Sequence, residues 1–497
     1  MIKTPFSTYR LIATAVLLCL GTVCAWAYSF MERGIAYNAS GNRAVVTSTS
    51  DITRNYYGLL SARIPAYVEH DGTSYQVTTI NDRAFMGCPT LTSMTILPGV
   101  SRIGSQAFQG CSRLSSISIP QGIIAINDAT FAGCTALSKV QMASTITSIA
   151  ADAFNGCASL GSVTLPLGLN LLGERAFKDC ASLREVTLNS RVRVINKETF
   201  AGCSSLEAVT IPDNIRSIEE RAFGDCASLS TVRLGINVNT VSHRAFEGCH
   251  RFATIEVDAS SPYFNTLNGM LTDVDRNKLL LCPPAYVQVD GHISLPTRLV
   301  SIGEYAFAQN SRLKSITFGS ALAEVEQYAF AGCASIDTIA FPTATRYFGD
   351  RIFEGCSKLG MVRFGNSVVS FGSALFNGCD NMRILHIRER NPQLIDIAPD
   401  AFDYIKEQCT LYVPLGLRER YENMEAFQGF KAIVEEAVEL KGDINGDDIT
   451  NGADLTLLFG YLLDADNRGF DLQYFDVNED GTINGTDVTE LYNILLQ

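Results

Sequence analysis

Apolar and polar residues between about 78 and 413 follow one pattern that returns every 23 residues. Each repeat carries a phenylalanine, a cysteine three positions later, a leucine, and then two apolar residues that alternate with polar ones, as at Ile117 and Ile119. Strict alternation predicts a short strand with one buried face, and Pro120 predicts its end. The pattern therefore predicts many short strands of the same kind.

The phenylalanines keep this spacing over eight repeats, and the register resumes after one interruption. They are Phe85, Phe108, Phe131, Phe154, Phe177, Phe200, Phe223 and Phe246, then Phe307, Phe330, Phe353 and Phe376. A single coil cannot bury its own apolar face, so neighbouring coils must stack. We predict a solenoid of stacked short parallel β-strands over 78–413. It is interrupted by a hairpin insertion at about 258–300, where Asn268-Gly269 is a typical turn.

The repeated Ala-Phe-x-x-Cys, as in Ala84 to Cys88, resembles the BspA-like leucine-rich repeat family of exported bacterial proteins. The resemblance implies a leucine-rich repeat solenoid with 23-residue repeats. It also implies a β-rich N-terminal cap at 28–77, a C-terminal cap at 414–434 and a linker at 435–441. Adhesion to host or extracellular components is the function that this family implies.

Two segments near the C-terminus place oxygen-bearing side chains at positions 1, 3, 5, 9 and 12 of a twelve-residue loop. This spacing wraps hard oxygen ligands around one calcium ion, with a backbone carbonyl at position 7. An amphipathic helix follows each loop. We predict two Ca²⁺ ions, against the alternative of an acidic turn pair without an ion. The predicted ligands are Asp443, Asn445, Asp447, Ile449, Asn451 and Asp454 in the first loop, and Asp476, Asn478, Asp480, Thr482, Asn484 and Asp487 in the second.

The duplicated loop, with aspartate at position 12 and no helix leading in, resembles a type I dockerin. This implies a small all-α calcium-binding domain at 442–497 that binds a cohesin-like module of another protein. The contacts would lie near Gly452-Ala453, Gly485-Thr486 and the helices that follow. The first loop departs from the family pattern, because Asp448 replaces the usual glycine and Ile449-Thr450 reverses the usual order. These departures affect the expected affinity of the first site.

The chain has 15 cysteines, and 11 of them occupy the same position of the repeat. In an exported protein, cysteines usually form disulfides. Here the shared position favours an internal ladder of small, buried, free thiols. Stacked Cα atoms about 4.8 Å apart do not by themselves exclude bonding, so a sparse disulfide and a metal site remain alternatives.

No arrangement of residues in the repeats indicates catalysis, so we predict no catalytic residue, no organic cofactor and no enzyme activity. The five histidines are scattered and show neither metal-ligand spacing nor a nucleophile–base pairing. Outward strand positions of the first eight coils are mostly Ser and Thr, and none is aromatic. They form either a polar docking surface or a solvated row of hydroxyl groups favoured by β-propensity.

The N-terminus and the charge distribution complete the prediction. Lys3 and Arg10 precede an uncharged run from Leu11 to Ala27, which ends in Ala25-Trp26-Ala27. This is typical of a signal peptide, 1–27, cleaved near Ala27; a membrane anchor and a lipoprotein signal fit less well. No later run is long enough to span a membrane. The net charge of −13 is concentrated in 442–497, with 12 acidic residues and one basic residue, and this opposes nucleic-acid binding.

These features together predict an exported, non-enzymatic binding or adhesion protein at the cell surface or secreted. Its solenoid would bind an unknown protein or glycan, and a calcium-dependent dockerin–cohesin-type interaction would anchor it. The alternative is a component of a polysaccharide-degrading complex with a hydrolase-associated role, because dockerins usually accompany glycoside hydrolases.

Overall fold

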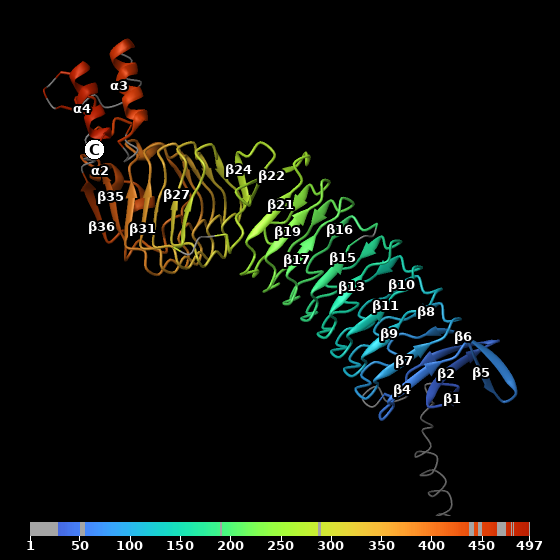
Figure 1. Ribbon diagram of the computed structural model, residues 1–497. Helices are drawn as coiled ribbons and strands as arrows, with labels where there is room; N and C mark the ends of the chain where they lie inside the picture. Colours follow the sequence, from blue (N-terminus) through green and yellow to red (C-terminus); the bar gives the residue numbers. More distant parts are fainter. Residues whose placement is uncertain are drawn as a thin grey trace, which may run out of the picture. The chain divides into compact units, whose positions relative to one another are not determined.

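A computed structural model describes residues 28–49, 55–188, 191–286, 290–436, 442–445, 450–464, 474–478, 480 and 482–496. The predicted signal peptide and the predicted ligands Asp447 and Ile449 lie outside these residues. The chain divides into two compact units, 1–249 and 250–497 (Figure 1).

The first unit begins with a β-sheet in the region where the N-terminal cap is predicted. Its strand order is β1-β2-β3-β6-β5, and all neighbouring pairs are antiparallel except β3 and β6. Asp71 and Gly72 join β5 to β6 with φ values of 48° and 72°, as a tight hairpin turn requires. The strands are β1 (Phe30–Glu32), β2 (Ile35–Ser40), β3 (Arg43–Thr47), β5 (Tyr67–His70) and β6 (Thr73–Ile80).

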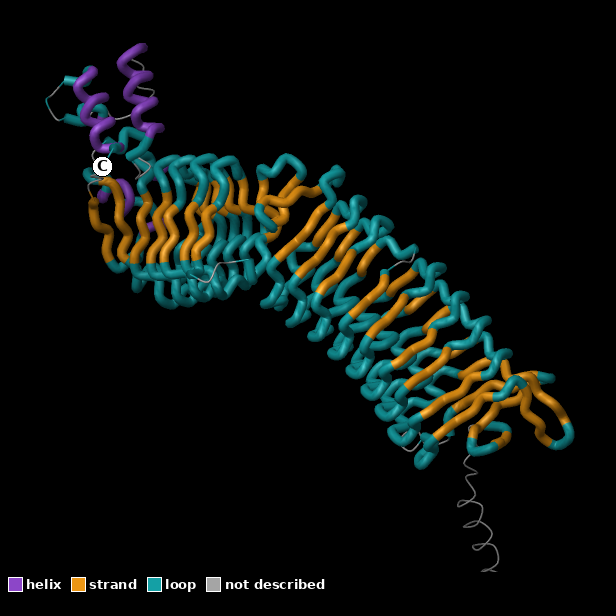
Figure 2. Tube along the Cα trace, in the orientation of Figure 1, coloured by secondary structure: helices purple, strands orange, loops and turns teal. Residues whose placement is uncertain are grey.

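Each coil that follows contributes two strands, one to each of two parallel rows (Figure 2). The predicted strands form the first row, in which Ser116 pairs with Lys139, one repeat later. A second row of two-residue strands, such as Ser148 beside Leu171, is not predicted by the alternation because two residues are too few to show a period. The first row is β4 (Ser61–Ile64), β7 (Ser93–Ile96), β9 (Ser116–Ser118), β11 (Lys139–Gln141), β13 (Ser162–Thr164), β15 (Glu185–Thr187), β17 (Ala208–Thr210) and β19 (Thr231–Leu234). The second row is β8 (Arg102–Ile103), β10 (Ala125–Ile126), β12 (Ser148–Ile149), β14 (Leu171–Leu172), β16 (Val194–Ile195), β18 (Ser217–Ile218) and β20 (Thr240–Val241).

The repeated phenylalanines form a continuous ladder in the core of this unit. Phe85 and Phe108 are fully buried, and their rings stack with centroids 5.3 Å apart and planes 1° apart. The following pairs, to Phe246, keep centroid separations of 5.1 to 5.7 Å. Stacking of the coils therefore buries the apolar faces that a single coil would leave exposed, as predicted from the sequence.

The cysteines form a second ladder beside the phenylalanines. All 13 that the structure describes are buried free thiols, which confirms the preferred interpretation of their spacing. The Sγ of Cys111 donates to the carbonyl oxygen of Phe85 at 3.2 Å, and Cys134 donates in the same way to Phe108 at 3.1 Å. Burial raises the pKa of the Cys180 thiol to about 12, so the proton needed for such a bond stays in place at neutral pH.

The second unit continues the same construction after the insertion. Asn268 and Gly269, with φ values of 52° and 87°, turn β22 into β23, and β24 then pairs antiparallel with β23. Lys278 of β24 also pairs in parallel with Ser301 of β26, so the insertion extends the second row of strands as well as interrupting the repeat. The first-row strands are β21 (Thr254–Val257), β25 (His292–Ser294), β27 (Ser315–Thr317), β29 (Thr338–Ala340), β31 (Met361–Phe364), β33 (Ile384–Ile387), β35 (Thr410–Pro414) and β36 (Ala432–Glu436). The others are β22 (Phe264–Leu267), β23 (Met270–Asp273), β24 (Lys278–Leu281), β26 (Ser301–Ile302), β28 (Glu324–Val325), β30 (Tyr347–Phe348), β32 (Ser370–Phe371) and β34 (Asp396–Ile397).

The segment predicted as the C-terminal cap closes the core of the second unit. Phe402 stacks on Phe376 with centroids 6.2 Å apart, and Phe427 stacks on Phe402 at 5.7 Å. Tyr421 is fully buried beside them, and its hydroxyl donates to the carbonyl oxygen of Glu389 at 2.6 Å. The segment contains α2 (Arg418–Glu422) and the 3₁₀ helix η3 (Glu425–Phe427), and another 3₁₀ helix, η2 (Pro392–Leu394), precedes β34.

The dockerin-like region is small and helical. It contains α3 (Gly452–Asp464) and α4 (Gly485–Leu495), which pack around a buried cluster of Ile444, Leu458, Phe475, Val477 and Leu491. Within the part of the chain that the structure describes, no helix is both long and apolar enough to cross a membrane.

Candidate calcium loops and interaction surfaces

In each predicted calcium loop, the aspartate at position 12 joins the beginning of the loop to its end by hydrogen bonds. Asp454 is fully buried; its Oδ1 accepts from the backbone N–H of Asn445 at 3.0 Å, and its Oδ2 accepts from that of Asn451 at 2.8 Å. Asp487 is also fully buried and accepts from the backbone N–H groups of Asn478 and Asn484 at 3.1 and 2.8 Å. Positions 3, 9 and 12 are thus joined by matching hydrogen bonds in both loops.

The end of each loop is also the start of a helix, which explains this local structure. The side chain of Asn484 accepts from the N–H of Thr486 at 2.8 Å, and the side chain of Asp487 accepts from the backbone N–H of Asn484, which completes a capping box for α4. In the first loop, the side chain of Asn451 accepts from the N–H of Ala453 at 2.7 Å. An aspartate in the first turn is further stabilised by the positive N-terminal end of the helix dipole.

The other described oxygens of the second loop bond within the loop. Asp476 Oδ1 accepts from the backbone N–H of Asp480 at 3.0 Å, and the hydroxyl of Thr482 donates to Asp480 Oδ1 at 2.6 Å. The bonds from Thr482 hold the pKa of the Asp480 carboxyl below its usual value, so this carboxylate stays charged. Charged carboxylate and amide oxygens are the donors that calcium prefers, so the residues present fit this ion.

The described part of the loops does not bring the predicted ligands into a closed metal cluster. No three His, Cys, Asp or Glu side chains among the described residues converge to hold a metal ion. Hydrogen bonds join Asn445, Asn451 and Asp454 in the first loop, and Asp443 is only 2% exposed. The full ligand set stays a prediction.

Both helices expose a large apolar pair at equivalent positions. Phe459 and Leu463 on α3 are 48% and 86% exposed, and Tyr492 and Leu496 at the end of α4 are 53% and 69% exposed. Each pair lies 16 and 20 residues after the first residue of its loop. The small residues that the dockerin resemblance singles out, Gly452-Ala453 and Gly485-Thr486, are exposed as well. Sequence reasoning missed the apolar pairs, although the duplicated spacing would have revealed them.

The outward face of the first strand row in the first unit is polar. The side chains predicted to point outward are exposed or partly exposed, and none is aromatic. They are Ser93, Thr95, Ser116, Ser118, Lys139, Gln141, Ser162, Thr164, Glu185, Thr187, Ala208, Thr210, Thr231 and Arg233. This surface offers hydroxyl groups for hydrogen bonds along several coils.

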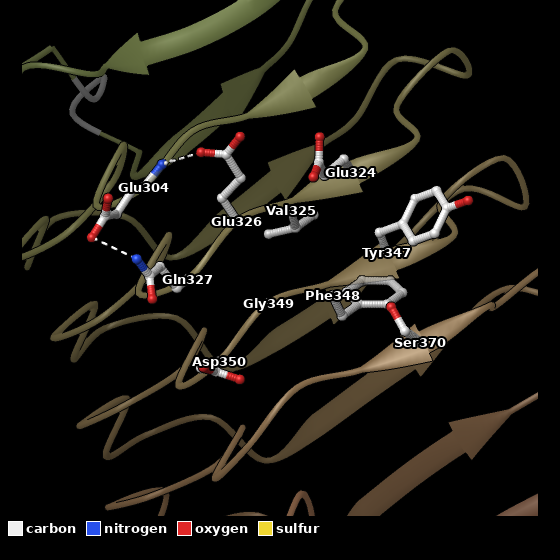
Figure 3. A pocket seen from close by; sticks show the side chains of 10 residues that line it. All are labelled: Glu304, Glu324, Val325, Glu326, Gln327, Tyr347, Phe348, Gly349, Asp350 and Ser370. Carbon is white, nitrogen blue, oxygen red and sulfur yellow. Dashed lines mark hydrogen bonds between the residues drawn. The ribbon is translucent and has the colours of Figure 1, made fainter. Parts of the chain in front are cut away.

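A shallow acidic groove lies on the second strand row of the second unit (Figure 3). It has a volume of about 420 Å³ and is lined by Glu304, Glu324, Glu326, Asp350 and the half-exposed Tyr347, among others. Glu326 accepts from the N–H of Glu304 at 3.1 Å and pairs with Lys278. The other carboxylates that line the groove have oxygen atoms that can accept hydrogen bonds from a cationic or hydroxyl-bearing group.

Comparison with known families and structures agrees with this architecture. The family described as BspA type leucine rich repeat region matches residues 73–181, 126–253 and 291–408, which cover more than half of the chain. The type I dockerin domain matches residues 441–496. No curated protein matches the chain.

Several solved structures are similar to this chain. A leucine-rich repeat protein from Bacteroides ovatus is 25% identical with a TM-score of 0.55, over 75% of this chain and 99% of that one. A leucine rich cell surface protein from Faecalibacterium prausnitzii is 24% identical with a TM-score of 0.47, over 72% of this chain and 93% of that one. The pneumococcal vaccine antigen PcpA is 19% identical with a TM-score of 0.49, over 82% and 98%. The Bacteroides ovatus protein, with a TM-score above 0.5, shares the leucine-rich repeat fold of this chain.

Type I dockerins are generally calcium-binding domains that imply a cohesin-type partner, and neither a leucine-rich repeat solenoid nor a dockerin is a catalytic kind of domain. The repeated core, the capped loops and the family matches lead to one conclusion. The chain belongs to the BspA-type leucine-rich repeat proteins and carries a type I dockerin domain at its C-terminal end.

Proposed function

We propose that this protein is an exported, non-enzymatic binding protein. Its dockerin domain attaches it to a cohesin-like module in a calcium-dependent way, while its solenoid binds a protein or glycan. The observation that carries the proposal is the pair of equivalent apolar patches, Phe459 with Leu463 and Tyr492 with Leu496, on helices that start at calcium-type loops. Exposed apolar side chains of this size at a protein surface favour a protein partner.

The loops give calcium a direct role in presenting these patches. Asp443, Asn445, Asn451 and Asp454 would hold the first ion, and the second loop supplies the matching residues from Asp476 to Asp487. Bound calcium supplies positive charge that offsets the repulsion between these carboxylates. Because Asp454 and Asp487 also fix the first turns of α3 and α4, holding them in place orients both helices.

Export is proposed from the sequence, since a basic start and an apolar run before Ala27 are typical of a signal peptide. On the solenoid, the hydroxyl-rich strand face of the first unit is the proposed ligand surface. Ser and Thr side chains in regular rows can bond to polar groups of a protein or a glycan.

The test is a pull-down of the mature chain with immobilised type I cohesin modules. We expect retention in calcium and loss with chelator. The double variant Phe459→Ser/Tyr492→Ser should lose binding at least tenfold, because aromatic anchors carry a large share of interface free energy. The matched control is Tyr57→Ser, which changes a tyrosine that is 80% exposed in the first unit.

Binding that persists in chelator, or that survives the double variant unchanged, would contradict the proposed anchor. Turnover of a polysaccharide panel by the purified protein would instead support the alternative role in polysaccharide degradation.

A further inference from the structure

The strand face changes character at the last coils of the second unit. Charged and imidazole side chains gather here, where most outward positions of the first unit carry Ser or Thr. They are Arg363 on β31, His386 on β33, Arg388 just after β33, and Glu436 on β36. His386 Nδ1 lies 2.7 Å from Glu436 Oε1, and Arg388 Nε lies 3.8 Å from the same oxygen. We call these four residues the terminal cluster. Outward positions on a strand are normally solvated, yet the side chains of His386 and Arg388 are only 9% and 10% exposed.

The start of the dockerin lies against this cluster and its surroundings. Asn366, beside β31, donates from Nδ2 to the carbonyl oxygen of Asn445 at 3.3 Å. The guanidinium carbon of Arg390 lies 5.4 Å from the centroid of the Tyr474 ring, a cation–π distance. Asp443 is 2% exposed and lies close enough to Arg388 for its charge to favour the protonated guanidinium.

The charges on the two sides are complementary. Burial and the nearby charge of Arg363 both lower the pKa of the Arg388 guanidinium, and Glu436, Asp443 and Tyr474 oppose that shift. On the solenoid side, one glutamate faces two guanidinium groups. Asp443 supplies the second negative charge from the dockerin side. Half-buried charges are stabilised only when they are paired, so the terminal cluster is better balanced with the loop in place.

We propose that the terminal cluster is a docking surface for the dockerin's own first calcium loop, and that docking and calcium compete for Asp443. The proposal rests on the calcium binding put forward above. Asp443 is the proposed first ligand of the first loop. It is buried two residues before Asn445, whose carbonyl oxygen accepts from Asn366, so calcium binding and docking both involve this buried end of the loop. The ion also brings two positive charges towards Arg363 and Arg388, which repel it. Linkage then requires that docking weakens calcium binding at this loop and that calcium weakens docking.

The first test measures calcium binding to the mature full-length chain by titration calorimetry. Arg388→Met removes one positive charge of the terminal cluster and leaves an unbranched side chain of similar length. We expect one site to bind calcium about tenfold more tightly in this variant and the other site to stay unchanged. Lys358→Met, which removes an exposed positive charge from the same unit, is the matched control and should change neither site.

Identical calcium isotherms for the wild type and Arg388→Met would overturn the competition. A failure of the proposed calcium binding would look different. In that case, neither the wild type nor any variant would release heat when calcium is added.

The second test follows docking itself in the wild-type background and does not depend on how Arg388→Met folds. Spin labels are attached to cysteines introduced at Glu419 on α2 and Gly460 on α3, both exposed. The native thiols are buried and remain unlabelled. We expect one narrow distance distribution in chelator and a broader, longer one at saturating calcium. A distribution that is already broad in chelator, or one that calcium leaves narrow and unshifted, would overturn the proposal.

Discussion

The thiol of Cys333 donates to the backbone carbonyl oxygen of Phe307, 3.1 Å away in the preceding coil. The same bond joins Cys356 to Phe330 and Cys379 to Phe353, both at 3.1 Å. Each of these carbonyl groups already accepts the backbone N–H of the residue three positions later, so the thiol adds a second hydrogen bond to it. The bond also gives the buried S–H group a partner inside the core. The repeated cysteine is a structural hydrogen-bond donor in this protein.

This arrangement predicts how the thiols react. All 13 are buried, so a reagent dissolved in water does not reach them in the folded protein. Burial also raises the pKa of Cys356 to about 12, which keeps this thiol in its unreactive protonated form at neutral pH. In the native protein, a thiol reagent should therefore modify almost none of these cysteines. After denaturation without reductant it should modify 13. A count lower by two or more would reveal a disulfide.

The break in the ladder at Asn310 predicts a stabilising substitution. Asn310 occupies the cysteine position after Phe307 and is fully buried, and among the described residues neither its side-chain oxygen nor its side-chain nitrogen has a hydrogen-bond partner. Asn310→Cys removes an unsatisfied amide and should raise the unfolding free energy by about 1–3 kcal/mol. Thermal unfolding of both proteins in the presence of reductant measures this gain in stability. Asn239→Cys, at an exposed position, should leave the midpoint unchanged.

Removing single calcium ligands should separate the two loops. Asp443→Ala and Asp476→Ala each delete the first carboxylate of one loop, so we expect each variant to lose one calcium-binding site and keep the other. Titration calorimetry on the mature chain counts the sites. A third variant, Asn484→Ala, removes the N-cap of α4 and should lower the stability of this helix by about 1 kcal/mol even in chelator. Two intact sites in Asp476→Ala would contradict the assignment of the second loop.

The Glu436 carboxylate predicts a dependence of stability on acid. Burial raises the pKa of Glu436, but the hydrogen bond from His386 and the charges of Arg388 and Arg363 outweigh burial and hold this pKa below its usual value. A carboxyl group with a lowered pKa in the folded state stabilises the fold above the unfolded pKa of about 4.3, and this contribution is lost as the pH falls through the folded pKa.

Denaturant unfolding of the wild type between pH 7 and pH 3 would measure this loss. Glu436→Gln cannot ionise, so it should be less stable than the wild type at pH 7 and show a shallower decline into acid. Parallel curves for the two proteins would show that the pairing of Glu436 contributes nothing.

Much of the repeat architecture could be predicted because its cause is local and periodic. A phenylalanine, a cysteine and alternating apolar residues every 23 positions can bury their apolar faces only by stacking, and the buried stack from Phe85 onward confirms this. The calcium-type loops were also visible, since oxygen ligands for one ion must occur at fixed spacing. Asp454 and Asp487, which the spacing predicts as ligands, are buried and join the two ends of their loops by hydrogen bonds.

The terminal cluster could not be predicted, because its members are far apart in sequence and the repeat length changes where they meet. His386 follows Arg363 by 23 residues, but Tyr412 follows His386 by 26, and Glu436 comes from a strand outside the repeat. The second strand row and its groove were hidden for a similar reason, since two-residue strands carry no readable period.

The sequence by itself determined the solenoid, its repeat length, the free thiol ladder and the ligand spacing of the two loops, because each depends on residues within one repeat or one loop. Only the tertiary structure decided which outward positions lose contact with water. It brings Glu436 to His386 across 50 residues of chain and Asn445 to Asn366 across 79. Such pairings depend on how the last coils and the dockerin pack, and no local pattern encodes that packing.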